Sequence, residues 1–101
     1  MQFLVTLYDG TDAEAPARRA ATRPAHLAGL KGNVADGKLL FGGPLFDDAQ
    51  TTIGSFLVVE CADRVELDAI IANDPYTKGN VWQKVEVKPT RLVVRDGTIT
   101  P

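Results

Sequence analysis

The fold is decided by residues 52–76, TIGSFLVVECADRVELDAIIANDPY, in which a strand pattern passes directly into a helix pattern. The segment Thr52–Cys61 is rich in β-branched and aromatic residues and predicts a strand. Asp63 is placed to cap a helix, and Glu66 three residues later fits a capping box. We expect that helix to end near Asn73. Its apolar face consists of Leu67, Ile70 and Ile71.

The N-terminal third predicts a strand followed by a helical region. Gln2–Tyr8 is rich in β-forming residues and ends at an Asp-Gly turn pair, which favours a strand. The alanine-rich stretch that follows favours helix, with Asp12 or Thr11 as the candidate cap. Pro24 lies inside the pattern, so we expect a short first piece and a main piece from about Arg23 to Ala35. An Asp-Gly pair then stops the helix.

Two further strands are expected, one before and one after residues 52–76. Lys38–Phe46 reads as a strand, and Gly42-Gly43-Pro44 within it predicts a bulge or a close backbone approach, at an edge or irregular position. Val81–Val94 alternates apolar and polar residues and predicts a long final strand, bent at Pro89. The last residues are expected to be a tail or an edge extension.

The resulting order, β-α-β-β-α-β, is typical of an α+β ferredoxin-like sandwich, in which two helices cover one face of an antiparallel sheet. Residues 1–101 are expected to form a single domain. The other face of the sheet needs a cover, because strands such as FLVV (56–59) cannot be polar on one side. We therefore expect a homodimer or a higher homo-oligomer.

The composition of the chain disfavours several classes of function. The net charge is −2 and the basic residues are scattered, which disfavours nucleic-acid binding. Apolar runs are far too short to cross a membrane, and the N-terminus resembles a strand rather than a signal peptide. Cys61 is the only cysteine, so it offers neither an internal disulfide nor metal-ligand spacing and fits a reducing cytoplasm.

His26 and Asp74 are the candidate catalytic pair. His26 is the only histidine and therefore the one side chain that titrates near neutrality without a large perturbation. Asp74 precedes a proline and could equally start a turn. Because both helices lie on one side of the expected sheet, the two residues can approach, and a carboxylate on one imidazole nitrogen would make the other a general base.

Short motifs occur in a fixed order along the chain: Arg23-Pro24-Ala25-His26-Leu27, Gly37-Lys38-Leu39-Leu40, Gly42-Gly43-Pro44, Asp74-Pro75-Tyr76, Gly79 and Val85-Val87-Lys88-Pro89. In this order and spacing the chain resembles the YCII family, from the first strand to about Val94. The resemblance implies a dimeric α+β barrel, similar to muconolactone isomerase. It also implies a histidine–aspartate pair in a pocket, which falls on His26 and Asp74. One branch of that family is a dehydrochlorinase acting on a chlorinated hydroquinone.

Other residues are candidates for substrate contact, each with a plainer alternative. Arg23 could bind an anionic group or be a solvated charge. Gly43 could bring backbone N–H groups near a ligand or mark a bulge. Tyr76 and Trp82 could line the pocket or pack a dimer interface. Ser55 has no histidine at a motif spacing, which disfavours a serine hydrolase.

The leading hypothesis is an enzyme, of the lyase, isomerase or dehydrochlorinase type, that acts on a small cyclic or aromatic molecule without metal or organic cofactor. His26 would be its acid/base and Asp74 would orient it. The alternative is a non-catalytic ligand-binding or accessory module of the same fold. Haem or metal binding through His26 is a weaker reading, because no second ligand has a matching position.

Overall fold

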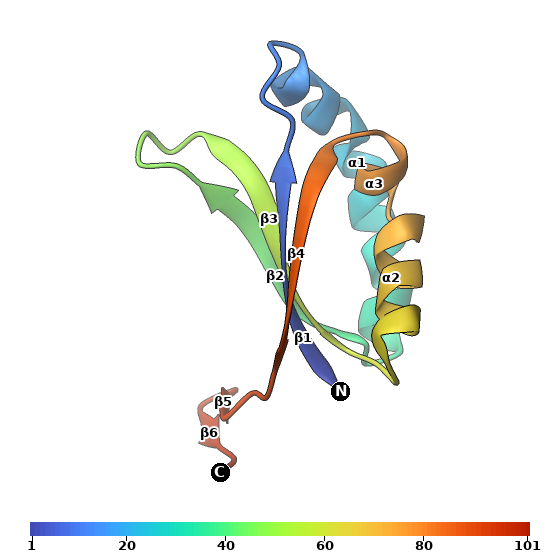
Figure 1. Ribbon diagram of the computed structural model, residues 1–101, viewed down its shortest axis with the longest axis vertical. Helices are drawn as coiled ribbons and strands as arrows, with labels where there is room; N and C mark the ends of the chain where they lie inside the picture. The colour runs from blue at the N-terminus through green and yellow to red at the C-terminus, as the bar shows by residue number, and fades with distance from the viewer.

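The computed structural model describes residues 1–101 and consists of a four-stranded sheet with helices on one face, plus a small C-terminal hairpin (Figure 1). None of its helices is long and apolar enough to span a bilayer. The elements are β1 (Gln2–Asp9), α1 (Ala15–Ala35), β2 (Leu39–Phe46), β3 (Thr52–Glu60), α2 (Arg64–Asn73), α3 (Pro75–Lys78), β4 (Trp82–Thr90), β5 (Val94–Arg95) and β6 (Thr98–Ile99).

The sheet has the strand order β2-β3-β1-β4, and all neighbouring strands are antiparallel. The first and third strands therefore occupy the centre, and the second and fourth lie at the edges. The helices all lie on the same side of this sheet (Figure 1). The ferredoxin-like α+β fold expected from the order of elements is confirmed.

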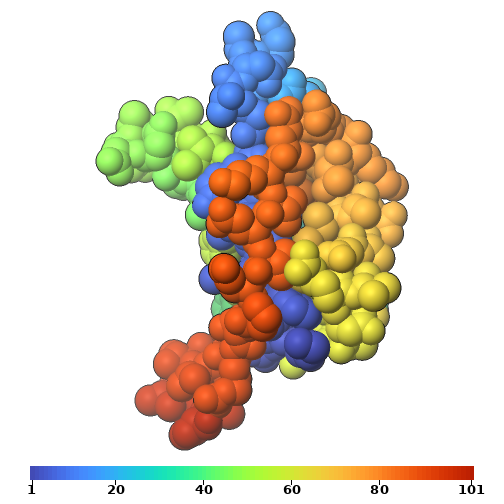
Figure 2. Space-filling model, in the orientation of Figure 1, coloured from blue at the N-terminus to red at the C-terminus, as the bar shows by residue number.

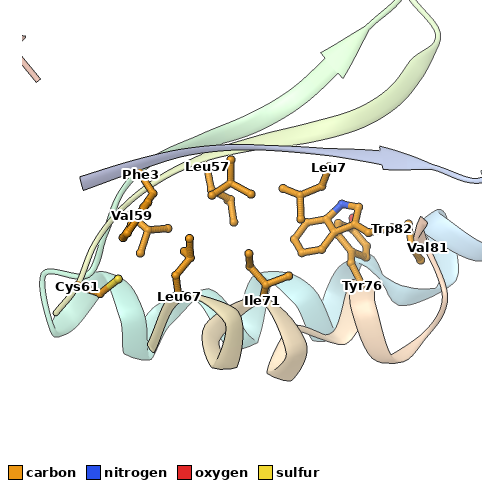
Figure 3. Close-up of a cluster of buried hydrophobic side chains, with 11 residues drawn as sticks. Phe3, Leu7, Leu57, Val59, Cys61, Leu67, Ile71, Tyr76, Val81 and Trp82 are labelled. Atoms are coloured by element: carbon orange, nitrogen blue, oxygen red, sulfur yellow. The ribbon is translucent and has the colours of Figure 1, made fainter. Parts of the chain in front are cut away.

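The core lies between the sheet and the helices, as Figure 3 shows. Alternate residues of β1 (Phe3, Val5 and Leu7) point into it and are at most 2% exposed. Leu67 of α2 meets them from the helix layer and is fully buried. Asp63 accepts the Glu66 backbone N–H at 2.9 Å, so α2 begins with the predicted cap.

The first helix is not divided as expected, because α1 runs continuously through Pro24. Proline lacks the N–H that would bond the Ala20 carbonyl. Both residues are exposed, so water can solvate that carbonyl and the helix continues. The cap prediction is also wrong: Asp12 bonds Arg18 instead, and α1 starts after Glu14 without a side-chain cap.

At the C-terminal end of α1, the Asp-Gly stop is confirmed. Gly37 has φ +73°, and its N–H donates to the Val34 carbonyl. The Lys38 N–H donates to the Asn33 carbonyl, which completes a Schellman motif. The chain then turns directly into β2.

The glycines of β2 mark a close approach rather than the bulge itself. A Cβ at Gly42 would lie 3.1 Å from the Leu57 side chain, and one at Gly43 would lie 3.1 Å from the Phe56 ring. The register shifts fall on either side of this pair, near Leu40 and near Phe46. Pro44 is tolerated because β2 is an edge strand, as expected.

The final strand is shorter than predicted. β4 ends at Thr90 and passes through Pro89 without a register shift, again at a sheet edge. The remaining residues form the separate β5–β6 hairpin, which extends away from the body (Figure 2). Its turn residues, Asp96 and Gly97, have φ of +52° and +73°, a pairing that suits a two-residue hairpin turn.

The face of the sheet opposite the helices carries a row of apolar side chains. Because Phe3 and Val5 point toward the helices, Leu4 points to the other face. It pairs with Val58, which in turn pairs with Phe41. Leu4 and Phe41 are 39% and 38% exposed. This row spans three strands, with Val58 buried between the two partly exposed side chains.

Replacing Leu67 by alanine tests the account of the core. Because the leucine is fully buried, Leu67→Ala should lower the free energy of unfolding by about 2–5 kcal/mol. Val65 is 77% exposed on the same helix, so Val65→Ala should change it by less than about 1 kcal/mol. Urea denaturation followed by circular dichroism measures both. Equal effects of the two substitutions would contradict this packing.

Candidate functional site

Asp74 joins two helices and binds a histidine. It lies between α2 and α3 with φ −68° and ψ 135°, the extended geometry favoured before a proline. Its Oδ1 accepts the backbone N–H of Tyr76 at 2.8 Å and so caps α3. The same oxygen lies 2.8 Å from His26 Nδ1. Because an ionised carboxylate only accepts, this contact favours the hydrogen on Nδ1, and in the neutral imidazole with that tautomer Nε2 carries the lone pair.

The His26 ring is held by aromatic neighbours. It stacks on Tyr76 with ring centroids 3.9 Å apart and planes 13° from parallel. Trp82 makes T-shaped contacts with both rings, with its centroid 5.5 Å from that of His26 and 5.3 Å from that of Tyr76. Burial raises the pKa of the Tyr76 phenol, which therefore stays neutral at physiological pH. These contacts fix the imidazole without using Nε2.

A second polar group lies beside this aromatic cluster. Arg19 Nη1 donates to both carboxylate oxygens of Asp9, at 2.8 and 3.0 Å. Arg19 Nη2 donates to Ser55 Oγ at 2.8 Å, and the guanidinium lies 4.7 Å from the centre of the Tyr76 ring. Trp82 Nε1 also donates to Ser55 Oγ, at 3.1 Å. The arginine network and the His26 cluster are thus continuous through Tyr76 and Trp82.

Both groups border a broad cavity between α1 and the β2–β3 part of the sheet. Its volume is about 1120 Å³. Apolar side chains form much of its wall, and Leu27 and Phe46 there are 42% and 53% exposed. The polar residues that line it include His26, Ser55 and Arg23. The cavity combines an apolar interior with a few polar contacts, as small-molecule sites do.

Most of the predicted site residues meet at this cavity. His26, Arg23, Gly43 and Tyr76 line it, and Asp74 lies behind the histidine. Arg23 makes no ion pair, whereas Arg19 does. The exception is Trp82, which is 5% exposed and absent from the cavity wall. Its indole packs in the core behind His26, with its N–H on Ser55.

The sequence reasoning missed Arg19, Asp9 and Ser55. Arg19 could have been found, because Arg23 and His26 follow it at helical spacings of four and seven residues on one face. The sequence pattern could also have indicated Ser55, because it is a polar residue at a helix-facing position of a mostly apolar strand. No local pattern indicates that Asp9, in an Asp-Gly turn pair, binds Arg19.

Several known proteins are similar to this chain. Protein YciI of Escherichia coli O6:H1 (strain CFT073) and that of Shigella flexneri are each 31% identical over 97 residues, covering 90% of this chain and 99% of theirs. Derivative of benzaldehyde biosynthesis cluster protein C of Emericella nidulans is 33% identical over 85 residues, covering 76% of this chain and 87% of that protein.

A solved structure supports the same relationship. The 5-chloro-2-hydroxyhydroquinone dehydrochlorinase of Burkholderia phenoliruptrix AC1100, in complex with 2,5-dihydroxybenzoquinone, superposes with a TM-score of 0.76. It is 28% identical, and the match covers 90% of this chain and 94% of that one. The family model of the YCII-related domain matches residues 1–91. The chain therefore belongs to the YCII-related domain family.

Proposed function

We propose that this protein is a cofactor-independent enzyme of the lyase or isomerase type, in which His26 is the general acid/base and Asp74 positions it. The observation that carries the proposal is the 2.8 Å contact between His26 Nδ1 and Asp74 Oδ1, which leaves Nε2 free in a residue that lines the cavity. A small-molecule role agrees with the dehydrochlorinase of similar structure and with the relative from a benzaldehyde biosynthesis cluster.

The reaction would begin with proton removal. His26 Nε2 takes a proton from a carbon or oxygen of the substrate, and the electron pair of that bond moves into the ring or carbonyl system. Asp74, which accepts the Nδ1 hydrogen, stabilises the imidazolium that forms. The electrons then either expel a leaving group, giving elimination, or take the proton back from His26 at another atom, giving isomerisation.

The cavity favours an oxygen-substituted ring as substrate. Its apolar wall suits an aromatic or cyclic body, and Leu27 and Phe46 expose part of that wall. Arg23 has no carboxylate partner in the protein and can bind an anionic substituent through its planar guanidinium. Gly42 and Gly43 both line the cavity, and a side chain at Gly42 would lie on its helix-facing side against Leu57. The absence of that side chain lets a ligand approach the backbone of β2 at Gly42 and Gly43.

Turnover by substituted proteins tests these roles. With chlorinated and hydroxylated hydroquinones as the substrate panel, His26→Ala should lower kcat roughly 100- to 10,000-fold, because the base is removed. Asp74→Asn should also lower kcat, since the Nδ1 hydrogen loses its charged acceptor. Lys31→Ala, on the exposed side of α1, is the matched control and should retain activity. Chloride release and the absorbance of the quinone product measure each rate.

The same experiment separates an enzyme from a binding module. Activity that survives His26→Ala would contradict the proposed role of the histidine. A protein that binds members of the panel and converts none of them would instead be a non-catalytic ligand-binding module.

We also propose that two copies pair through the uncovered face of the sheet, in the cytoplasm. In the apolar row Leu4, Val58 and Phe41, the two outer side chains stay 39% and 38% exposed within one chain, and Val58 lies buried between them. The polar residues of β4 on that face carry both signs of charge (Lys84, Glu86 and Lys88), so two identical faces can complement each other. Cys61 is buried and unbridged, which agrees with a reducing compartment.

The mass in solution tests the pairing. Light scattering after size exclusion should give twice the 10.9 kDa of one chain. Phe41→Glu places a charge in the apolar row and should shift the protein toward the mass of one chain. Val65→Glu, at a position of α2 that is 77% exposed and lies in the helix layer, should leave the mass unchanged. A single-chain mass for the unaltered protein would refute the proposed homodimer.

A further inference from the structure

Ser55 is a buried polar residue whose hydrogen-bonding capacity is only partly used. It lies on the helix-facing side of β3, is 4% exposed, and lines the cavity. Buried hydroxyls in proteins are nearly always hydrogen-bonded. The proposed chemistry at His26 does not use this residue.

Both acceptor positions of the Ser55 hydroxyl are occupied. A serine oxygen has two lone pairs and one hydrogen. Arg19 Nη2 donates to it at 2.8 Å and Trp82 Nε1 at 3.1 Å. Only the hydroxyl hydrogen of Ser55 is left without a partner, because no group of the protein accepts it. Ser55 can therefore offer a ligand only a donor.

The two donors are themselves fixed in place. Arg19 is held by both oxygens of Asp9, in a pair whose side chains are 14% and 7% exposed. Trp82 is packed in the core with 5% exposure. A hydroxyl that accepts from a guanidinium is polarised and becomes a stronger donor. It needs no rearrangement to meet a ligand, because its orientation is already set.

Ser55 and His26 both contact the indole of Trp82. The imidazole and the indole make a T-shaped contact with centroids 5.5 Å apart, and the indole N–H donates to Ser55 Oγ. Ser55 and His26 also line the same cavity, so one ligand can contact both.

We propose that the Ser55 hydroxyl binds an oxygen of the substrate that carries or acquires negative charge, so that the substrate class is an aromatic or enolic oxyanion. The proposal rests on the function proposed for His26. When Nε2 removes a proton, the bond electrons are delocalised onto a conjugated oxygen, and the Ser55 O–H donates to that oxygen. Serine keeps its proton throughout, so it acts as a donor in an oxyanion-stabilising arrangement.

The test is binding of a matched pair of probes, measured by calorimetry without turnover. Pentafluorophenolate is an aromatic oxyanion at neutral pH, and pentafluoroanisole is its neutral methylated counterpart. Ser55→Ala should weaken binding of the phenolate about 10- to 100-fold, the effect of losing a hydrogen bond to a charged group. Binding of the anisole should change less than about twofold, because its oxygen carries no charge to stabilise.

Further variants distinguish a binding role from a structural one. Ser55→Cys replaces the hydroxyl by a thiol of similar size, and it serves as the test if Ser55→Ala fails to fold. Because a thiol is a poor donor, this variant should show an intermediate loss of affinity for the phenolate. Thr22→Val removes a hydroxyl that donates to the Arg18 carbonyl and does not line the cavity, and it should bind both probes normally.

Three results would overturn the proposal: equal losses for the two probes, no loss for either, or failure of the unaltered protein to bind the phenolate. Because binding is measured without turnover, these outcomes are independent of whether His26→Ala abolishes activity.

Discussion

The carboxylate of Asp74 joins the backbone of the fold to the imidazole. Its Oδ1 caps α3 through the Tyr76 N–H and accepts from His26 Nδ1 of α1. One residue thus connects the adjacent helices α2 and α3 to α1, which is distant from them in sequence. Pro75 holds Asp74 in the extended geometry this requires. Tyr76, positioned by the same cap, supplies the ring on which the imidazole stacks. The orientation of His26 is therefore a consequence of how α2 ends.

The second constraint is the burial of a charged pair. Taking Arg19 and Asp9 out of water costs free energy, which their paired hydrogen bonds offset only in good geometry. Such a pair is weak evidence for stability. What it does provide here is a guanidinium fixed beside Tyr76 and Ser55 at the cavity wall. Positive charge near a reacting group is most effective where water is scarce and nothing has to move.

Local patterns in the sequence were enough to predict the order of strands and helices along the chain, the capped helix α2 and the stop at Gly37, because each depends on residues close together in the chain. The expected topology allowed His26 and Asp74 to approach each other, and the family resemblance implied that they pair. Trp82 could not be placed in this way. Simple alternation with Val85 and Val87 would place the Trp82 side chain on the sheet face opposite the helices. Instead, Asp9 pairs with Trp82 and Gln83 is left unpaired, which forms a bulge. This bulge turns the indole into the core. The prediction that Pro24 breaks the helix was wrong because the Ala20 carbonyl is exposed and water can solvate it. The exposure of that carbonyl depends on the tertiary structure and not on the local sequence.

The position of Trp82 has a practical consequence. It is the only tryptophan in the chain, it is buried, and its indole contacts His26 while its N–H bonds Ser55. The tryptophan fluorescence of the protein therefore originates from a single indole behind the cavity wall. Protonation of the imidazole or a change in the polarity around Ser55 acts on that emission directly, so the occupancy of the site can be followed without any label.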